Sequence, residues 1–84
     1  MDNKMEKINN SDFIRQVSQK TGYAQKSITE VLNAAADIVL DNLNDNKAST
    51  VFKGMIVYPA TYKNETTFAR ARFGKKFRNL APLS

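Results

Sequence analysis

The chain has 84 residues, of which 42% are hydrophobic, with a formal net charge of +5 and neither cysteine nor histidine. These absences exclude disulfides and metal sites with nitrogen or sulfur ligands as a source of stability. One domain of this size buries too small a fraction of its surface to be comfortably stable alone, so we expect association with a second chain.

The first predicted helix covers residues 11 to 21 and follows a polar segment, residues 1 to 9, that we expect to be a flexible extension. Ser11 is a good N-cap, and apolar residues recur behind it at amphipathic spacing. The helix is predicted to end at Gly22, because glycine readily takes the left-handed conformation that ends a helix.

Residues 25 to 44 show the clearest pattern, with apolar side chains at a period of 3.6 residues for more than four turns. The alanines at 34 to 36 give the middle of this helix small side chains, which would let another helix approach closely. This is compatible with a helix that crosses a partner chain. We predict that its apolar positions form the core or the dimer interface: Ile28, Val31, Leu32, Ala35, Ile38, Val39 and Leu43.

The pattern after Ala48 is that of β-strands. We predict a three-stranded antiparallel meander and a short final helix, at about residues 49 to 53, 56 to 62, 66 to 73 and 75 to 80. Pro59 cannot donate to a ladder, so its stretch is expected at a sheet edge or a bulge. Strict alternation in the last strand places Arg70 and Arg72 on the same face. The chain is thus predicted to be one α+β domain over residues 10 to 84.

Positive charge is concentrated in the second half of the chain. Residues 48 to 84 contain seven Lys or Arg and one acid, whereas residues 1 to 47 contain six bases and seven acids. Such segregation is typical of a surface that binds polyanions, although a merely soluble basic surface is the alternative. The candidate phosphate-binding residues are Lys53, Lys63, Arg70, Arg72, Lys75, Lys76 and Arg78.

These residue types suit phosphate. Arginine forks onto phosphate oxygens, and the segment after Gly74 opens a predicted helix whose free N–H groups and lysines could clamp a phosphate. Such contacts position a protein without reading bases, so we expect sequence-independent and salt-sensitive binding. The aromatic residues are either base-stacking platforms or core, and we favour core: Phe52, Tyr58, Phe68, Phe73 and Phe77.

The order of elements resembles the bacterial histone-like family of HU and integration host factor, over about residues 8 to 81. The resemblance rests on Ser11-Asp12-Phe13-Ile14 at the first helix, on Gly22, on the long helix, on the turn Gly54-Met55-Ile56-Val57-Tyr58 and on Phe73-Gly74-Lys75-Lys76-Phe77-Arg78. It implies an intertwined dimer with Phe52, Tyr58, Phe73 and Phe77 in its core or interface.

The chain also departs from the family pattern. Met55 and Ile56 stand where the family favours Phe and Gly, and Phe73 replaces a proline. Only fifteen residues separate Tyr58 from Gly74, too few for the long two-stranded arm that family members wrap around DNA, and the proline wedge of the arm tip has no counterpart. The resemblance therefore implies an arm-less variant without strong DNA bending.

Three functions follow as hypotheses. The first is a homodimeric nucleoid-type protein, bacterial or phage-encoded, that binds and condenses double-stranded DNA. The second is an interaction module that pairs with an arm-bearing histone-like paralogue or joins a larger assembly. The third is a binder of RNA or single strands. No catalytic residues, cofactor or metal are expected, because the acids are scattered and there is no phosphate loop. With no long apolar run and no signal-like start, we expect a cytoplasmic protein without membrane contact.

Overall fold

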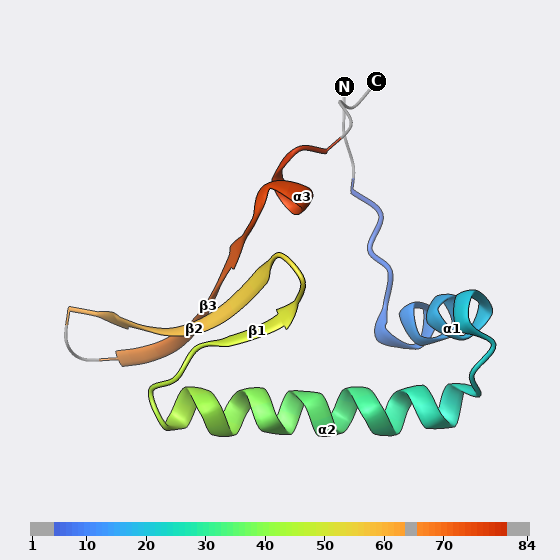
Figure 1. Ribbon diagram of the computed structural model, residues 1–84, viewed down its shortest axis with the longest axis horizontal. Coiled ribbons are helices and arrows are strands. Elements are labelled where there is room, and N and C mark those ends of the chain that lie inside the picture. Colours follow the sequence, from blue (N-terminus) through green and yellow to red (C-terminus); the bar gives the residue numbers. More distant parts are fainter. Residues whose placement is uncertain (1–4, 64–65, 81–84) are drawn as a thin grey trace. The chain divides into compact units, whose positions relative to one another are not determined.

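The computed structural model describes residues 5–63 and 66–80 (Figure 1). The fold class is α+β, as predicted, with two helices, a three-stranded antiparallel sheet and a short C-terminal helix. The elements in chain order are α1 (Asn10–Thr21), α2 (Gln25–Asn44), β1 (Ser49–Phe52), β2 (Met55–Tyr62), β3 (Thr66–Phe73) and α3 (Lys75–Arg78). None of the helices in this described part of the chain is long and apolar enough to span a membrane.

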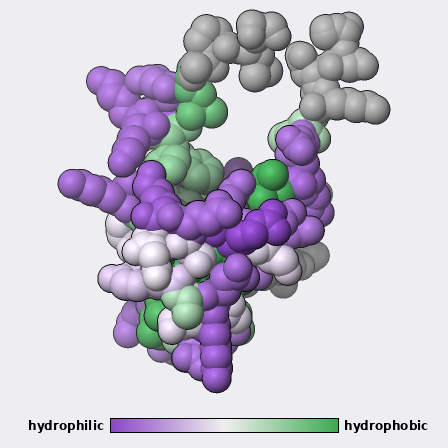
Figure 2. Space-filling view, turned by 90° about the vertical axis from the view of Figure 1, so that its right-hand side faces the viewer, coloured by the Kyte–Doolittle hydropathy of each residue, from purple (hydrophilic) through white to green (hydrophobic). Residues whose placement is uncertain are grey.

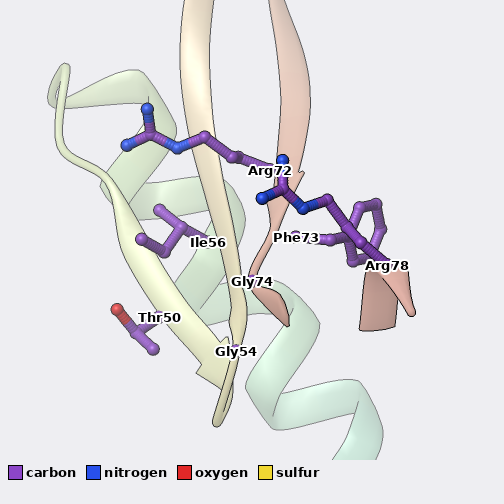
Figure 3. Close-up of a pocket in the computed structure, with 7 residues that line it drawn as sticks. All are labelled: Thr50, Gly54, Ile56, Arg72, Phe73, Gly74 and Arg78. Carbon is purple, nitrogen blue, oxygen red and sulfur yellow. The ribbon is translucent and has the colours of Figure 1, made fainter. Parts of the chain in front are cut away.

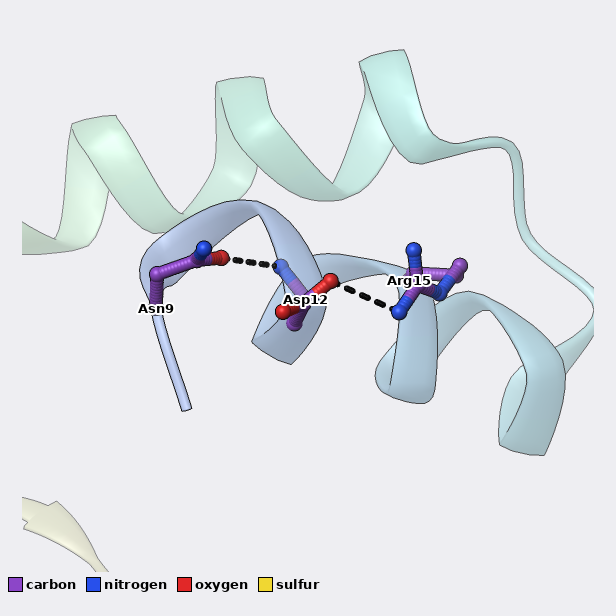
Figure 4. Close-up of polar contacts among 3 residues, drawn as sticks. All are labelled: Asn9, Asp12 and Arg15. Atoms are coloured by element: carbon purple, nitrogen blue, oxygen red, sulfur yellow. Dashed lines mark hydrogen bonds and ion pairs between the residues drawn. The ribbon is translucent and has the colours of Figure 1, made fainter. Parts of the chain in front are cut away.

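The start of α1 is set by Asn9 and not by Ser11, so the predicted N-cap was wrong. The Asn9 side-chain oxygen accepts a hydrogen bond from the backbone N–H of Asp12 at 2.8 Å, which satisfies one of the free donors of the first turn (Figure 4). Asp12 in turn pairs with Arg15 at 2.6 Å. Asn and Ser are both good N-caps. Asn9 is the N-cap because its side chain reaches the N–H of Asp12, the third residue of the helix.

The end of α1 is as predicted. Gly22 has a φ of 83° and donates its N–H to the carbonyl oxygen of Ser18 at 2.8 Å. The connection to α2 is held further by the Ser18 hydroxyl, which donates to the carbonyl oxygen of Tyr23 at 2.6 Å. These contacts lie within the first of two compact units, Met1–Ala35 and Ala36–Ser84.

The first unit has a small core made by Ile14 of α1 and Ile28 of α2, the two hydrophobic side chains that are buried among the described residues. Beside them is an apolar pocket of about 260 Å³, lined in part by Val31 and Leu32. Of the predicted core positions on α2, Ile28 is buried, while Val31 and Ile38 are 65% and 60% exposed. Leu32, Val39 and Leu43 are half-buried and Ala35 is exposed. Burial within the chain is thus seen for Ile28, and the assignment of the other positions to a core or a dimer interface stays a prediction.

In the second unit, β2 is the central strand of a sheet with the order β1-β2-β3. Eight residue pairs join β2 to β3, from Met55 opposite Phe73 to Tyr62 opposite Thr66. The pairing of β1 with β2 ends at Ser49 opposite Val57. Beyond Val57, residues 58–62 and 66–70 thus form a two-stranded extension, called the ribbon below.

Pro59 lies in this ribbon, opposite Ala69. On its other side, the described residues provide no strand, so Pro59 occupies an edge position in a strand that is central elsewhere. The edge location expected for a proline is confirmed.

Predicted boundaries in this unit differ slightly from the structure. The turn between β1 and β2 is made by Lys53 and Gly54, and α3 ends at Arg78 instead of residue 80. Of the three residues between the predicted strands at 56 to 62 and 66 to 73, Lys63 has a φ of 52°, and the other two lie outside the described residues.

Candidate nucleic-acid interface

The pairing register separates the sheet into two faces. Because directly paired residues share a face and successive residues alternate, Arg70 and Arg72 lie together, opposite Tyr58 and Ile56. We call this side the arginine face; it comprises Ile56, Tyr58, Ala60 and Tyr62 of β2 and Phe68, Arg70 and Arg72 of β3. Both arginines are exposed.

Arg72 lies against an aromatic ring of the same face. Its guanidinium carbon is 5.9 Å from the centroid of the Tyr58 ring, within the range of a cation–π contact. Tyr58 is half-buried and belongs to the central strand, so it provides a fixed support for the longer side chain. The arginine head is thereby held near the sheet surface while its charge stays accessible.

A pocket of about 270 Å³ lies at the end of the sheet near α3 (Figure 3). Arg72 of β3 and Arg78 of α3 both line it, and Figure 3 shows their side chains extending across the strands from neighbouring elements. The other lining residues are Thr50, Gly54, Ile56, Phe73 and Gly74. Two guanidinium groups and a threonine hydroxyl at one pocket are donors suited to phosphate oxygens.

A glycine pair holds α3 beside this pocket. Gly74 donates its backbone N–H to the carbonyl oxygen of Gly54 at 2.7 Å, which joins the start of α3 to the β1–β2 turn. A Cβ at Gly54 would lie 3.3 Å from two ring atoms of Phe77, so the ring packs directly on the turn. The rings of Phe73 and Phe77 are 6.0 Å apart, tilted by 60°. This packing fixes the position from which Arg78 extends.

Among the described residues, the basic side chains of the second unit have no acidic partner. Within residues 5–63 and 66–80 the one ion pair joins Arg15 to Asp12, in the first unit. None of the seven predicted phosphate-binding side chains therefore has a described carboxylate as a salt-bridge partner. No described acid therefore competes with an external anion for these side chains.

The structure does not bring all seven predicted residues to one place. Arg70, Arg72 and Arg78 lie at or near the pocket, whereas Lys63 lies at the far end of the ribbon, with its Nζ 5.3 Å from the centroid of the Tyr62 ring. Lys53 is exposed in the β1–β2 turn. Lys75 and Lys76 are exposed on α3.

The four residues of α3 make little more than one turn, and the N–H groups of Phe77 and Arg78 both donate to the carbonyl oxygen of Gly74. A helix this short adds little dipole. The phosphate clamp predicted at its start therefore depends on Lys75 and Lys76 alone and stays a prediction.

Thr50 is a lining residue that the sequence did not indicate. It lies on β1 opposite Ile56, which in turn pairs with Arg72, so the three residues form one row across the sheet. Only the cross-strand register connects Thr50 to the arginines. A short polar residue in a strand carries no such signal by itself.

The aromatic residues predicted to be core are incompletely covered. Phe52, Phe73 and Phe77 are 52%, 41% and 37% exposed, and Phe68 is 39% exposed. Their burial within the chain was wrongly predicted, because the sheet has too little other structure of the same unit packed on it. Whether they belong to a dimer interface stays a prediction.

Comparison with protein families gives a match to the family described as bacterial DNA-binding protein, over residues 8–79. Comparison with curated proteins gives no match. The family match includes both long helices, the whole sheet and α3. The chain therefore belongs to the bacterial DNA-binding protein family, the histone-like family of HU and integration host factor that its sequence resembles.

Proposed function

We propose that the protein is a non-enzymatic homodimer of the bacterial nucleoid that binds and condenses duplex DNA without sequence preference. The observation that carries this proposal is the arginine face, on which Arg70 and Arg72 lie together and exposed, with Arg78 at the adjoining pocket. Family membership supports an architectural role in DNA binding.

The proposed contacts are to phosphate. A guanidinium group presents several N–H donors in a planar fork that matches phosphate oxygens, and each neutralised phosphate releases condensed counterions. Lys53, Lys63, Lys75 and Lys76 extend the basic surface beyond the three arginines. Because phosphates are the same in every sequence, these contacts give affinity without base specificity.

Strong bending is not part of the proposal. The ribbon contains five residue pairs and is thus about 17 Å long at roughly 3.4 Å per residue, too short to follow a DNA groove far. The chain has two prolines, Pro59 and Pro82. Pro59 pairs with Ala69 inside the ribbon, so it is not placed to wedge between base pairs.

Exposed apolar side chains support the homodimer. Val31 and Ile38, seven residues apart on one face of α2, are 65% and 60% exposed, and Figure 2 shows apolar side chains reaching the surface between polar ones. A single chain with two buried hydrophobic residues among those described lacks the core that an 84-residue domain needs. A second copy, bringing the same apolar helix face, would supply it.

The proposal is tested by duplex affinity at several salt concentrations. The logarithm of the binding constant should fall linearly with the logarithm of salt, with a slope of about −0.9 per neutralised phosphate. Arg70→Ala or Arg72→Ala removes two contacts from a dimer, so each should flatten the slope by about 1.8. Lys20→Ala, an exposed cation of α1, is the control and should leave the slope unchanged. Absent binding at low salt, or an unchanged slope in both arginine variants, would reject the proposal.

The second candidate is pairing with an arm-bearing histone-like subunit, which the exposed face of α2 also favours. Native mass spectrometry of the protein mixed with such a subunit separates the two functions. Homodimers that bind DNA support the first, whereas mixed dimers that replace them support the second.

A further inference from the structure

Three aromatic side chains surround a small residue on the arginine face. Tyr58 and Tyr62 lie two residues before and two residues after Ala60 on β2. Phe68 of β3 is the cross-strand partner of Ala60. Diagonal neighbours on one face of an antiparallel pair are about 7–8 Å apart, so the three rings lie within reach of one flat group placed over Ala60. Three aromatic residues of the ribbon thus share one face around a small residue.

Two of these rings are accessible. Tyr62 and Phe68 are 61% and 39% exposed. Arg70 and Arg72 share their face, and burying two guanidinium groups without anionic partners costs far too much for this face to become an apolar core. An interface with the duplex backbone needs the cations, but it does not use the exposed faces of Tyr62 and Phe68.

Basic groups lie on both sides of the rings. The Nζ of Lys63 is 5.3 Å from the centroid of the Tyr62 ring, and Arg72 lies over Tyr58. A ligand with flat groups joined by a chain of negative charges fits this alternation, because each flat group can stack while the adjoining charge meets a lysine or arginine.

We infer that the arginine face also binds single-stranded nucleic acid, with unpaired bases stacked on Tyr62 and Phe68 and the backbone phosphates on Lys63, Arg70 and Arg72. Base stacking on aromatic side chains tolerates any sequence, since every base has a π-face. A paired base has its faces covered by its neighbours in the helix and cannot use the rings. The inference goes beyond duplex binding and does not depend on it.

The test compares one strand with one duplex on the same variants. Fluorescence anisotropy gives the affinity of the full-length protein for labelled dT15, for rU15 and for a 15-base-pair duplex. We expect Tyr62→Ala and Phe68→Ala each to weaken dT15 and rU15 binding about tenfold, and to change duplex binding less than twofold. Tyr62→Phe, which keeps the ring, should restore single-strand binding. Thr61→Ala, at the neighbouring exposed position on the opposite face of β2, is the matched control and should change neither.

The outcomes separate this inference from the duplex proposal. Equal losses for strand and duplex, or no loss for either, would overturn it, and so would Tyr62→Phe failing to restore binding. A change in molar mass on Tyr62→Ala would assign the rings to a protein interface instead. Because the chain has three tyrosines and no tryptophan, quenching of tyrosine fluorescence by dT15 gives a second readout. It should shrink in Phe68→Ala, which keeps all three tyrosines but weakens binding, and stay unchanged in Thr61→Ala. Failure of the duplex proposal would appear separately, as absent duplex binding.

Discussion

The backbone N–H of Gly74 donates to the carbonyl oxygen of Gly54 at 2.7 Å, across twenty residues of sequence. This bond, with the Phe77 ring packed on Gly54, connects the β1–β2 turn to the start of α3. Arg78 extends from α3, so its place at the pocket beside Arg72 depends on the contact between the two glycines.

Gly54→Ala should destabilise the protein and weaken duplex binding. Gly54 has a φ of 101°, which alanine adopts only with strain, and the new Cβ would be 3.3 Å from the Phe77 ring. Strain and crowding together should cost about 2 kcal/mol or more in the free energy of unfolding, measured by urea denaturation. Gly22→Ala is the matched control. Its φ is 83° but nothing lies within 4 Å, so it should cost about 1 kcal/mol and leave duplex affinity unchanged. Equal effects of the two substitutions would show that the Phe77 contact is unimportant.

Asn9→Ala should destabilise α1. It removes the side-chain acceptor for the Asp12 N–H, and loss of an N-cap costs about 1 kcal/mol. Thermal unfolding followed by circular dichroism measures the change. Ser11→Ala is the control, because Ser11 is exposed inside the first turn and should change stability by less than about 0.5 kcal/mol. A larger loss of stability in Ser11→Ala than in Asn9→Ala would show that Ser11 is the N-cap.

Ile38→Glu should break the proposed homodimer. Ile38 is 60% exposed on α2, and a carboxylate there would be buried without a partner if a second copy covers this face. Sedimentation equilibrium should show a monomer and a weaker fold. Asp37→Ala changes the neighbouring exposed position and should leave the molar mass unchanged. A stable Ile38→Glu dimer would place the interface elsewhere.

Arg72→Lys should weaken duplex binding even though the charge is kept. Lysine lacks the planar fork that matches phosphate and the extended group that stacks on Tyr58. We expect about a three- to tenfold loss of affinity at constant salt, in line with one lost charge-assisted hydrogen bond. The salt slope should stay within about 1 unit of the unmodified protein, because the number of cations is the same. Unchanged affinity would mean that Arg72 acts only through its charge.

Local patterns in the sequence were enough for the elements. The 3.6-residue period predicted α2 at residues 25 to 44, the range observed, and strict alternation placed Arg70 and Arg72 on one face of β3. Gly22 marked the end of α1 because the left-handed conformation is a property of one residue. Even here the prediction of Ser11 as N-cap was wrong. Asn9 and Ser11 are both suitable N-caps, and only the folded turn shows that Asn9 accepts the hydrogen bond from Asp12.

What the sequence by itself determined is therefore the kind and extent of the helices and strands, the sign and location of the charge, and the family, because periodicity, capping and charge are properties of near neighbours. The tertiary structure decided the rest. It joined Gly74 to Gly54, brought Arg78 to Arg72, ended the pairing of β1 at Val57 and left the predicted aromatic core exposed. Those features depend on which distant residues meet. The free energy of such contacts is set by the strand register and the packing of the folded chain, and no short segment of sequence contains it.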